Sequence, residues 1–319
     1  MDDFPKFVEF HEEGPREGFQ IEKTVYPIGQ RVELIDLLSE TGLKHIQVGS
    51  FVSPTYVPQM ADTGELFNRI KRKAGVNYTA LWLNEKGFLK TLSANDVHID
   101  PRLLFYTSDL FSQQNNNCSA VDMRERQRDW IVLYKEHGYK IETAYVMTAF
   151  GCNLEGDIPV ERVLDNFRWI VRVCEETQTP LPTLMIADTM GWGNPQTVKR
   201  MIEAVRNIAP GARIGMHIHD TRGLGVANLY AAMSMGVDLF ESSIAGLGGC
   251  PFAGHGNARA AGNISTEDAV FMCHELGIET GIDLDKLIIA AQKVEEIIGS
   301  PLMGRVMHSG GLEKYRRGQ

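Results

Sequence analysis

The stretch IGMHIHDTRGLGVANLYAAMSMGVDLFESSI, from Ile214 to Ile244, decides the fold class. It opens with a short apolar run over residues 214–218 and closes with another over 239–244. Between them, residues 226–235 form an amphipathic segment that is long enough for a helix. The stretch therefore predicts two parallel strands joined by a helix.

The same alternation extends over the rest of the chain. Apolar runs typical of strands lie at 7–10, 45–48, 78–83, 103–107, 141–148 and 184–187. Helical patterns lie at 29–40, 60–73, 123–136, 160–176, 195–207 and 266–276, with a last one at 284–298. Eight strands in alternation with helices indicate an α/β fold, a (β/α)8 TIM barrel, with additional helices at the C-terminal end. An open doubly wound sheet is the alternative, but no G-x-G-x-x-G follows the first strand.

Length and composition favour one soluble, acidic globular domain. The 319 residues show no low-complexity linker, so we expect a single barrel domain over 1–319, with the segment from about 280 packed on it. A net charge of −9 argues against binding to nucleic acid or to an anionic membrane surface. Five cysteines without a C-x-x-C, and no signal-peptide pattern, predict a cytoplasmic protein.

His217-Ile218-His219 is the most specific candidate site in the chain. Alternation along a strand places both imidazoles on one face, and the carboxyl end of a barrel strand is where catalytic groups gather. Two buried, hydrogen-bonded histidines are the structural alternative. With oxygen donors near them, the pair predicts a divalent metal site, and oxygen ligands favour Mg²⁺ or Mn²⁺ over zinc.

Further polar residues follow other predicted strands. Arg16 and Glu17 lie in a tight Gly-Pro-Arg-Glu-Gly loop after the first strand, where they form either a surface ion pair or a functional pair. Gln47 lies in the second strand. Asp188 ends the sixth strand, and acid/base chemistry and helix capping are both open to it.

A glycine-rich segment follows the eighth strand. Residues 246–263 read GLGGCPFAGHGNARAAGN, and six glycines predict a mobile lid without regular structure. Cys250 in this lid is a candidate reactive thiol. Asn263 at its end could give an amide oxygen to the metal, or be a turn asparagine.

Taken together, the motifs GPREGFQ, GSFVSPTYVPQM, FSQQNNNCS, ADTMGWGNP, HIHDTRGLGVAN and SSIAGLGGCPFAGHGNARAAGNISTED resemble those of 3-hydroxy-3-methylglutaryl-CoA lyases, which are metal-dependent lyase barrels. The resemblance runs from about Val8 to Gly310. It implies retro-Claisen cleavage of a 3-hydroxyacyl-CoA to acetyl-CoA and a keto acid. It also implies an acyl-CoA thioester as substrate, and we expect a homodimer or a higher homo-oligomer.

The resemblance also implies residue roles. The metal ligands that match are His217, His219 and Asn263, with the acidic ligand at Glu17. Arg16 matches the residue that holds the thioester enolate oxygen. Proton transfer falls to Asp188 with His217, and to Cys250 at the enolate carbon.

Two residues depart from the family pattern. Glu17 stands where the family has Asp, and Gln47 stands where it has Glu. An amide cannot act as a base and carries no charge. Alternatives therefore remain: the same chemistry on citramalyl-CoA or a longer 3-hydroxyglutaryl-CoA, a related synthase or aldolase, or a non-catalytic acyl-CoA-binding paralogue.

Overall fold

The computed structural model describes residues 4–249 and 261–316, which fall into two compact units. Unit 1 comprises residues 4–5 and 100–240, and unit 2 comprises residues 6–99, 241–249 and 261–316. Strand β8 (Leu239–Ser242) is the point where the chain passes from unit 1 into unit 2.

Unit 1 is built on four parallel strands that are neighbours in chain order. Pairing of Ala187 with His217 sets the register of the last two, so the end of one strand lies beside the histidine motif of the next. The strands are β4 (Arg102–Tyr106), β5 (Thr143–Met147), β6 (Thr183–Asp188) and β7 (Ile214–Ile218). Its helices are α4 (Asp109–Asn116), α5 (Ala120–Glu136), α6 (Val160–Glu176), α7 (Pro195–Ile208) and α8 (Gly225–Met233).

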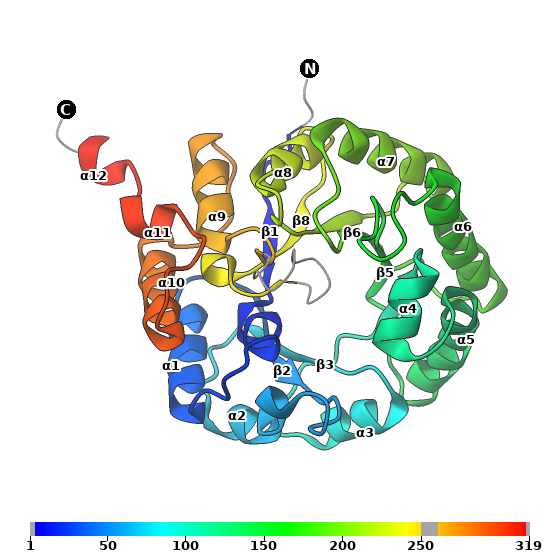
Figure 1. The fold of residues 1–319 in the computed structure, drawn as a ribbon, viewed down its shortest axis with the longest axis horizontal. Helices are drawn as coiled ribbons and strands as arrows, with labels where there is room; N and C mark the ends of the chain where they lie inside the picture. The colour runs from blue at the N-terminus through cyan, green and yellow to red at the C-terminus, as the bar shows by residue number, and fades with distance from the viewer. Residues whose placement is uncertain (1–3, 250–260, 317–319) are drawn as a thin grey trace. The chain divides into compact units, whose positions relative to one another are not determined.

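Two long helices of unit 1 form because each has an apolar stripe, and one of them also has a capped start. Helix α6 buries Val163, Phe167 and Ile170 at helical spacing, and each such side chain contributes about 1.5–3 kcal/mol on burial. Helix α7 starts at Pro195, after Asn194 has capped its first N–H groups. In Figure 1, α6 and α7 lie next to each other along the outer side of β5 and β6.

Unit 2 contains three further parallel strands, β1 (Glu9–Glu12), β2 (His45–Ser50) and β3 (Asn77–Leu81). A π-helical turn, η1 (Gly14–Gly18), follows β1, and two 3₁₀ turns are η2 (Pro58–Met60) and η3 (Ile244–Gly246). Its helices are α1 (Ile28–Ser39), α2 (Thr63–Arg69), α3 (Glu85–Ser93), α9 (Thr266–Glu275), α10 (Leu284–Ile298), α11 (Val306–Ser309) and α12 (Glu313–Arg316). Helix α10 packs against α1, as Figure 1 shows.

The eight expected strands are all present in the described residues, with shifted ends. Strand β1 covers residues 9–12 and not 7–10, so Glu12 lies inside the strand. Helices α3, α4, α11 and α12 were not predicted. Helix α4 is short and largely polar, and it forms because Ser108 caps its N-terminus, while Asn117 ends it in a left-handed conformation.

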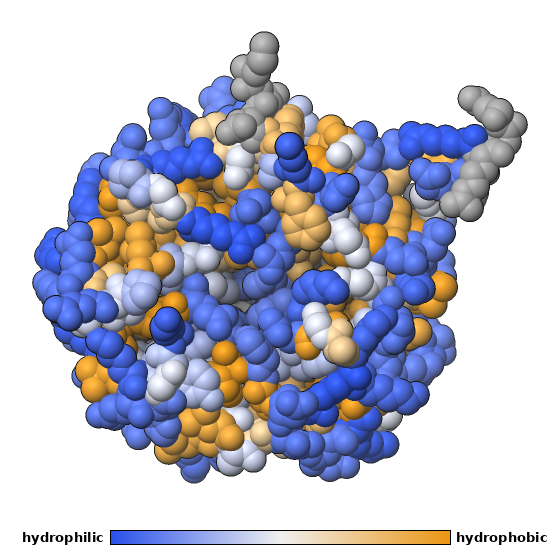
Figure 2. Space-filling view, turned by 180° about the vertical axis from the view of Figure 1, so that it is seen from behind, coloured by the Kyte–Doolittle hydropathy of each residue, from blue (hydrophilic) through white to orange (hydrophobic). Residues whose placement is uncertain are grey.

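Hydrophilic and hydrophobic residues are interspersed on the face shown in Figure 2. Among the described residues, none of the helices is both long enough and apolar enough to cross a membrane.

Candidate active site

His217 and His219 of unit 1 direct their side chains toward one point. His217 lies in β7 and His219 directly follows it, and their Nε2 atoms are 2.9 Å apart. His219 is 3% exposed. Two imidazole nitrogens at this separation can share a proton or can both coordinate one cation. The two imidazole nitrogens are therefore suitable ligands for a divalent metal ion.

Asp188 ends β6 beside this pair. Its Oδ1 accepts a hydrogen bond from the Trp192 backbone N–H (2.7 Å), and its Oδ2 accepts one from the Gly193 N–H (2.9 Å). The carboxyl group is buried, and burial raises its pKa above the usual aspartate range despite these two bonds. A Cβ atom at Gly193 would lie 2.9 Å from Oδ2, so a larger residue would displace the carboxylate. A buried carboxyl of this kind beside two histidines is a candidate acid/base group.

In unit 2, Arg16 and Glu17 lie on the π-helical turn η1, a local distortion that is common at functional sites. The Arg16 guanidinium lies 2.5 Å from a Glu13 oxygen and 3.3 Å from a Glu17 oxygen, and its Nε donates to the Gln47 side-chain oxygen. The side chains of Arg16 and Glu17 are each 12% exposed, so this is not a surface ion pair. Burial and three acceptors fix the direction of the guanidinium.

Two buried side chains of unit 2 contain amide atoms for which the described residues provide no hydrogen-bond partner. Gln47 uses its oxygen for Arg16, while its Nε2 has no partner among the residues that the structure describes. Asn263 is 1% exposed, and within the same residues neither of its amide atoms has a partner. An unsatisfied buried polar group costs about 1–3 kcal/mol. Such groups are typical of positions that bind a ligand or an ion, and the amide oxygen of Asn263 is a suitable donor for a hard divalent cation.

A buried carboxyl group supports the turn that carries Arg16. Glu12 accepts hydrogen bonds from the backbone N–H groups of Gly14 and Ile244 and from the Thr266 hydroxyl. Burial raises the pKa of Glu12 to about 8. The folded state therefore keeps a proton that the unfolded chain releases near the ordinary glutamate pKa.

We expect Glu12→Gln to make stability less dependent on pH. In the wild type, this one group lowers the free energy of unfolding by about 1.4 kcal/mol per pH unit as the pH rises from about 5 to about 8. The stability that it contributes is complete below the unfolded pKa and is lost as the pH rises through the folded one. Urea unfolding of both proteins at pH 5.5 and 8 measures this. If the free energy of unfolding falls equally in both proteins between these two pH values, Glu12 does not titrate abnormally.

Most of the predicted site residues fall into two groups. Asp188, His217 and His219 come together in unit 1, and Arg16, Glu17 and Gln47 come together in unit 2. Cys250 lies outside the described residues. The sequence reasoning did not give Glu13 a role, although its spacing of three residues from Arg16 would place the two together on a helical turn.

One family model, described as HMGL-like, matches residues 7–294. The chain belongs to the HMGL-like family. It is 38% identical over 295 residues to the 3-hydroxy-3-isohexenylglutaryl-CoA/hydroxy-methylglutaryl-CoA lyase of Pseudomonas aeruginosa, covering 92% of this chain and 94% of that one. It is also 38% identical to the mitochondrial hydroxymethylglutaryl-CoA lyase of Gallus gallus, covering 89% and 91% of the two chains.

Solved structures that resemble this chain come from the same family. The crystal structure of hydroxymethylglutaryl-CoA lyase from P. aeruginosa matches with a TM-score of 0.86 at 36% identity, over 97% of this chain and 98% of that one. An HMG-CoA lyase from Acinetobacter baumannii, in complex with coenzyme A and 3-methylmalate, matches with a TM-score of 0.85 at 32% identity, over 98% of both chains. The predicted α/β TIM-barrel fold is confirmed, and the chain is a carbon–carbon lyase of the HMGL-like family.

Proposed function

We propose that this HMGL-like lyase cleaves the C2–C3 bond of a 3-hydroxyacyl-CoA that carries a second carboxylate, with 3-hydroxy-3-methylglutaryl-CoA as the first candidate. The products are acetyl-CoA and a keto acid. One observation carries the proposal: His217 and His219 converge beside the buried Asp188 in a chain that is 38% identical to lyases named for this substrate.

The proposed roles follow the chemistry of the reaction. The substrate hydroxyl loses its proton to Asp188, assisted by His217; the C2–C3 bond breaks, and the thioester enolate takes up a proton at carbon. The Arg16 guanidinium suits the enolate oxygen because it is a fixed cation with several donors. Cys250, which lies outside the described residues, is the proposed proton donor at the enolate carbon.

Metal binding is part of the proposal. His217 and His219 are proposed as the nitrogen ligands, and Glu17 and Asn263 as the oxygen ligands that the family resemblance implies. Oxygen ligands favour Mg²⁺ or Mn²⁺ as the ion. When bound, such an ion polarises an oxygen of the substrate as a Lewis acid.

A thioester panel tests the proposed function. We expect release of acetyl-CoA from 3-hydroxy-3-methylglutaryl-CoA, from a longer 3-substituted 3-hydroxyglutaryl-CoA, or from both, and less from citramalyl-CoA. Highest kcat/KM on citramalyl-CoA would reassign the substrate within the same chemistry. Tight binding of these thioesters by the metal-loaded protein without any acetyl-CoA release would instead favour a non-catalytic paralogue.

We expect Gln47→Glu to lower activity on the preferred thioester. The added charge lies against Arg16, which already has Glu13 and Glu17 as partners, so it weakens the hold of the guanidinium on a substrate oxygen. We expect kcat/KM on the preferred thioester to fall by roughly tenfold to a hundredfold, because a buried charged hydrogen bond is worth about 1.5–3 kcal/mol. Steady-state kinetics on each thioester, with the exposed Gln196→Glu as control, measure this. An equal improvement on all thioesters would mean that Gln47 merely impairs the enzyme.

Two further features are proposed. We infer a cytoplasmic or similarly reducing location, supported by Cys118, Cys152, Cys174 and Cys273, which are all buried free thiols. We also infer a homodimer or a higher homo-oligomer, which sedimentation of the purified protein would test.

A further inference from the structure

In unit 1, one amide oxygen connects three loops. Asn153 lies between β5 and α6, and its Oδ1 accepts hydrogen bonds from the Trp192 indole Nε1 (2.7 Å) and from the Arg222 guanidinium (3.2 Å). Trp192 lies in the loop after β6, and Arg222 in the loop after β7. The loops that follow three neighbouring strands are thereby held by a single side chain, here called the Asn153 node.

The Arg222 guanidinium adds a second set of bonds within the node. It donates to the carbonyl oxygens of Met190 (2.7 Å) and Gly191 (3.0 Å) and lies 5.7 Å from the centre of the Trp192 ring. Gly151 also lies against the ring, since a Cβ atom there would lie 2.3 Å from an indole carbon. The indole is therefore held by packing as well as by hydrogen bonding.

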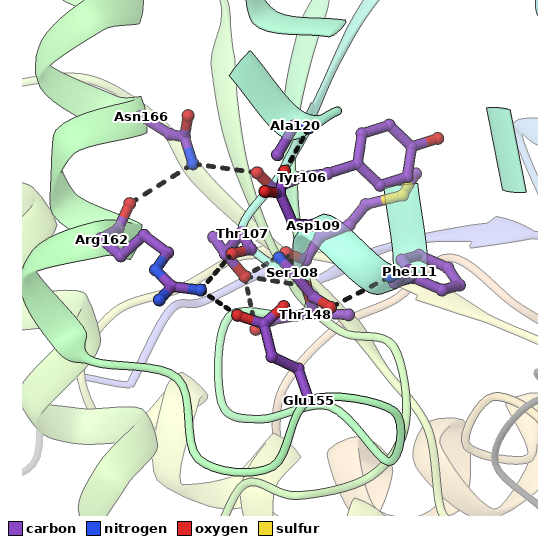
Figure 3. Close-up of polar contacts among 11 residues, drawn as sticks. Tyr106, Thr107, Ser108, Asp109, Phe111, Ala120, Thr148, Glu155, Arg162 and Asn166 are labelled. Atoms are coloured by element: carbon purple, nitrogen blue, oxygen red, sulfur yellow. Dashed lines mark hydrogen bonds and ion pairs between the residues drawn. The ribbon is translucent and has the colours of Figure 1, made fainter. Parts of the chain in front are cut away.

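The loop that carries Asn153 is itself anchored at its other end. Figure 3 shows the Glu155 carboxylate facing the Arg162 guanidinium of α6, with which it forms an ion pair, and this guanidinium also donates to the Thr107 carbonyl (3.3 Å). The Thr148 backbone N–H donates to the Thr189 hydroxyl (2.9 Å), which ties the start of this loop to the end of β6. The loop that carries Asn153 is thus held on both sides of this residue.

The node acts on the turn that binds Asp188. The node holds residues 190–192. The Trp192 backbone N–H donates to Asp188 Oδ1 (2.7 Å), and the N–H of the next residue, Gly193, donates to Oδ2 (2.9 Å). We propose that Asn153 is a positioning residue for the reaction, acting through Trp192 and Arg222 to hold this turn and thus the direction of the Asp188 carboxylate. The inference rests on the proposed function, in which Asp188 receives the substrate proton.

Three variants separate positioning from general stability. Asn153→Leu removes the acceptor, and Asn153→Asp keeps an oxygen for both donors. Trp192→Phe keeps an aromatic ring but replaces the indole and removes its N–H. Asn95→Leu, at an exposed asparagine of unit 2, is the matched control. The readouts are kcat and KM on the preferred thioester, the affinity for Mn²⁺ and the melting temperature.

We expect Asn153→Leu to lower kcat by roughly tenfold to a hundredfold, because small misplacements of a reacting group are costly. We expect KM, Mn²⁺ affinity and melting temperature to stay near those of Asn95→Leu, and Asn153→Asp to restore kcat to within about threefold of the wild type. A kcat of Asn153→Leu equal to that of Asn95→Leu would overturn the proposal. If Asn153→Leu does not fold, Trp192→Phe decides, and an unchanged kcat there overturns it.

Absence of turnover in the wild type would instead mean that the proposed function is wrong. The node can then still be tested through the fluorescence of Trp192. This signal is the emission of each protein minus the emission of the same protein with Trp192→Phe added. We expect acrylamide to quench this emission more strongly in Asn153→Leu than in Asn153→Asp, because release of the turn exposes the indole. Equal quenching in the two variants would show that Asn153 does not hold the turn.

Discussion

His219→Ala is expected to lose bound divalent metal and turnover together. His219 is almost fully buried, and its Nε2 lies 2.9 Å from that of His217, so the variant leaves one imidazole where two converge. Metal polarisation of a substrate oxygen is worth several kcal/mol, which corresponds to a loss of about 10³-fold or more in kcat/KM. Metal content by mass spectrometry and acetyl-CoA release measure the two effects on the same preparation.

The control for this variant is His137→Ala, at an exposed histidine that ends helix α5. It should keep both metal and activity. Retention of stoichiometric metal and of wild-type turnover in His219→Ala would show that the histidine pair is only a buried hydrogen-bonded pair.

Asp188→Asn is expected to lower kcat by about 10²–10⁴-fold, since an amide cannot accept the substrate proton. The asparagine oxygen can still accept one of the two backbone N–H bonds, but its NH₂ group then faces the other N–H. Because burial raises the pKa of Asp188, the acid limb of kcat/KM in the wild type should lie above the ordinary aspartate range. Activity is lost as the pH falls through this raised pKa, because the carboxyl is then protonated.

Asp129→Asn, which removes an exposed carboxylate from α5, controls for the change in net charge. Circular dichroism and a Mn²⁺ titration of Asp188→Asn show whether fold and metal site remain. A variant with intact fold and metal that turns over at the wild-type rate across the pH range would exclude Asp188 as the proton acceptor.

The fold could be predicted well because it depends on patterns that repeat along the chain. Residues 160–176 and 284–298 match helices α6 and α10, whose buried residues recur at helical spacing. The predictions failed where local capping decides the structure. Helix α4 has little apolar character, and Ser108 and Asn117 define its ends. The two-residue shift of β1 has a different cause, because Phe7 is apolar and yet 48% exposed.

The candidate site could be predicted only in part. Alternation in β7 correctly placed His217 and His219 on one face. The contact of Arg16 with Gln47 could not be derived, because it joins residues 31 positions apart and depends on the register of β1 and β2. The role of Asn153 could not be derived either, because an exposed asparagine in a loop is part of no sequence pattern. Its contacts with Trp192 and Arg222 exist only in the folded unit.

The most direct test of the central claim, a metal-dependent carbon–carbon lyase, is cleavage of the preferred thioester of the panel before and after chelation. The protein is dialysed against a strong chelator, assayed for acetyl-CoA and the keto acid, and assayed again after addition of Mg²⁺ or Mn²⁺. The account predicts equimolar products from the untreated protein, none after chelation, and recovery with either ion. Full activity in the presence of the chelator, with no metal detected in the protein, would contradict it.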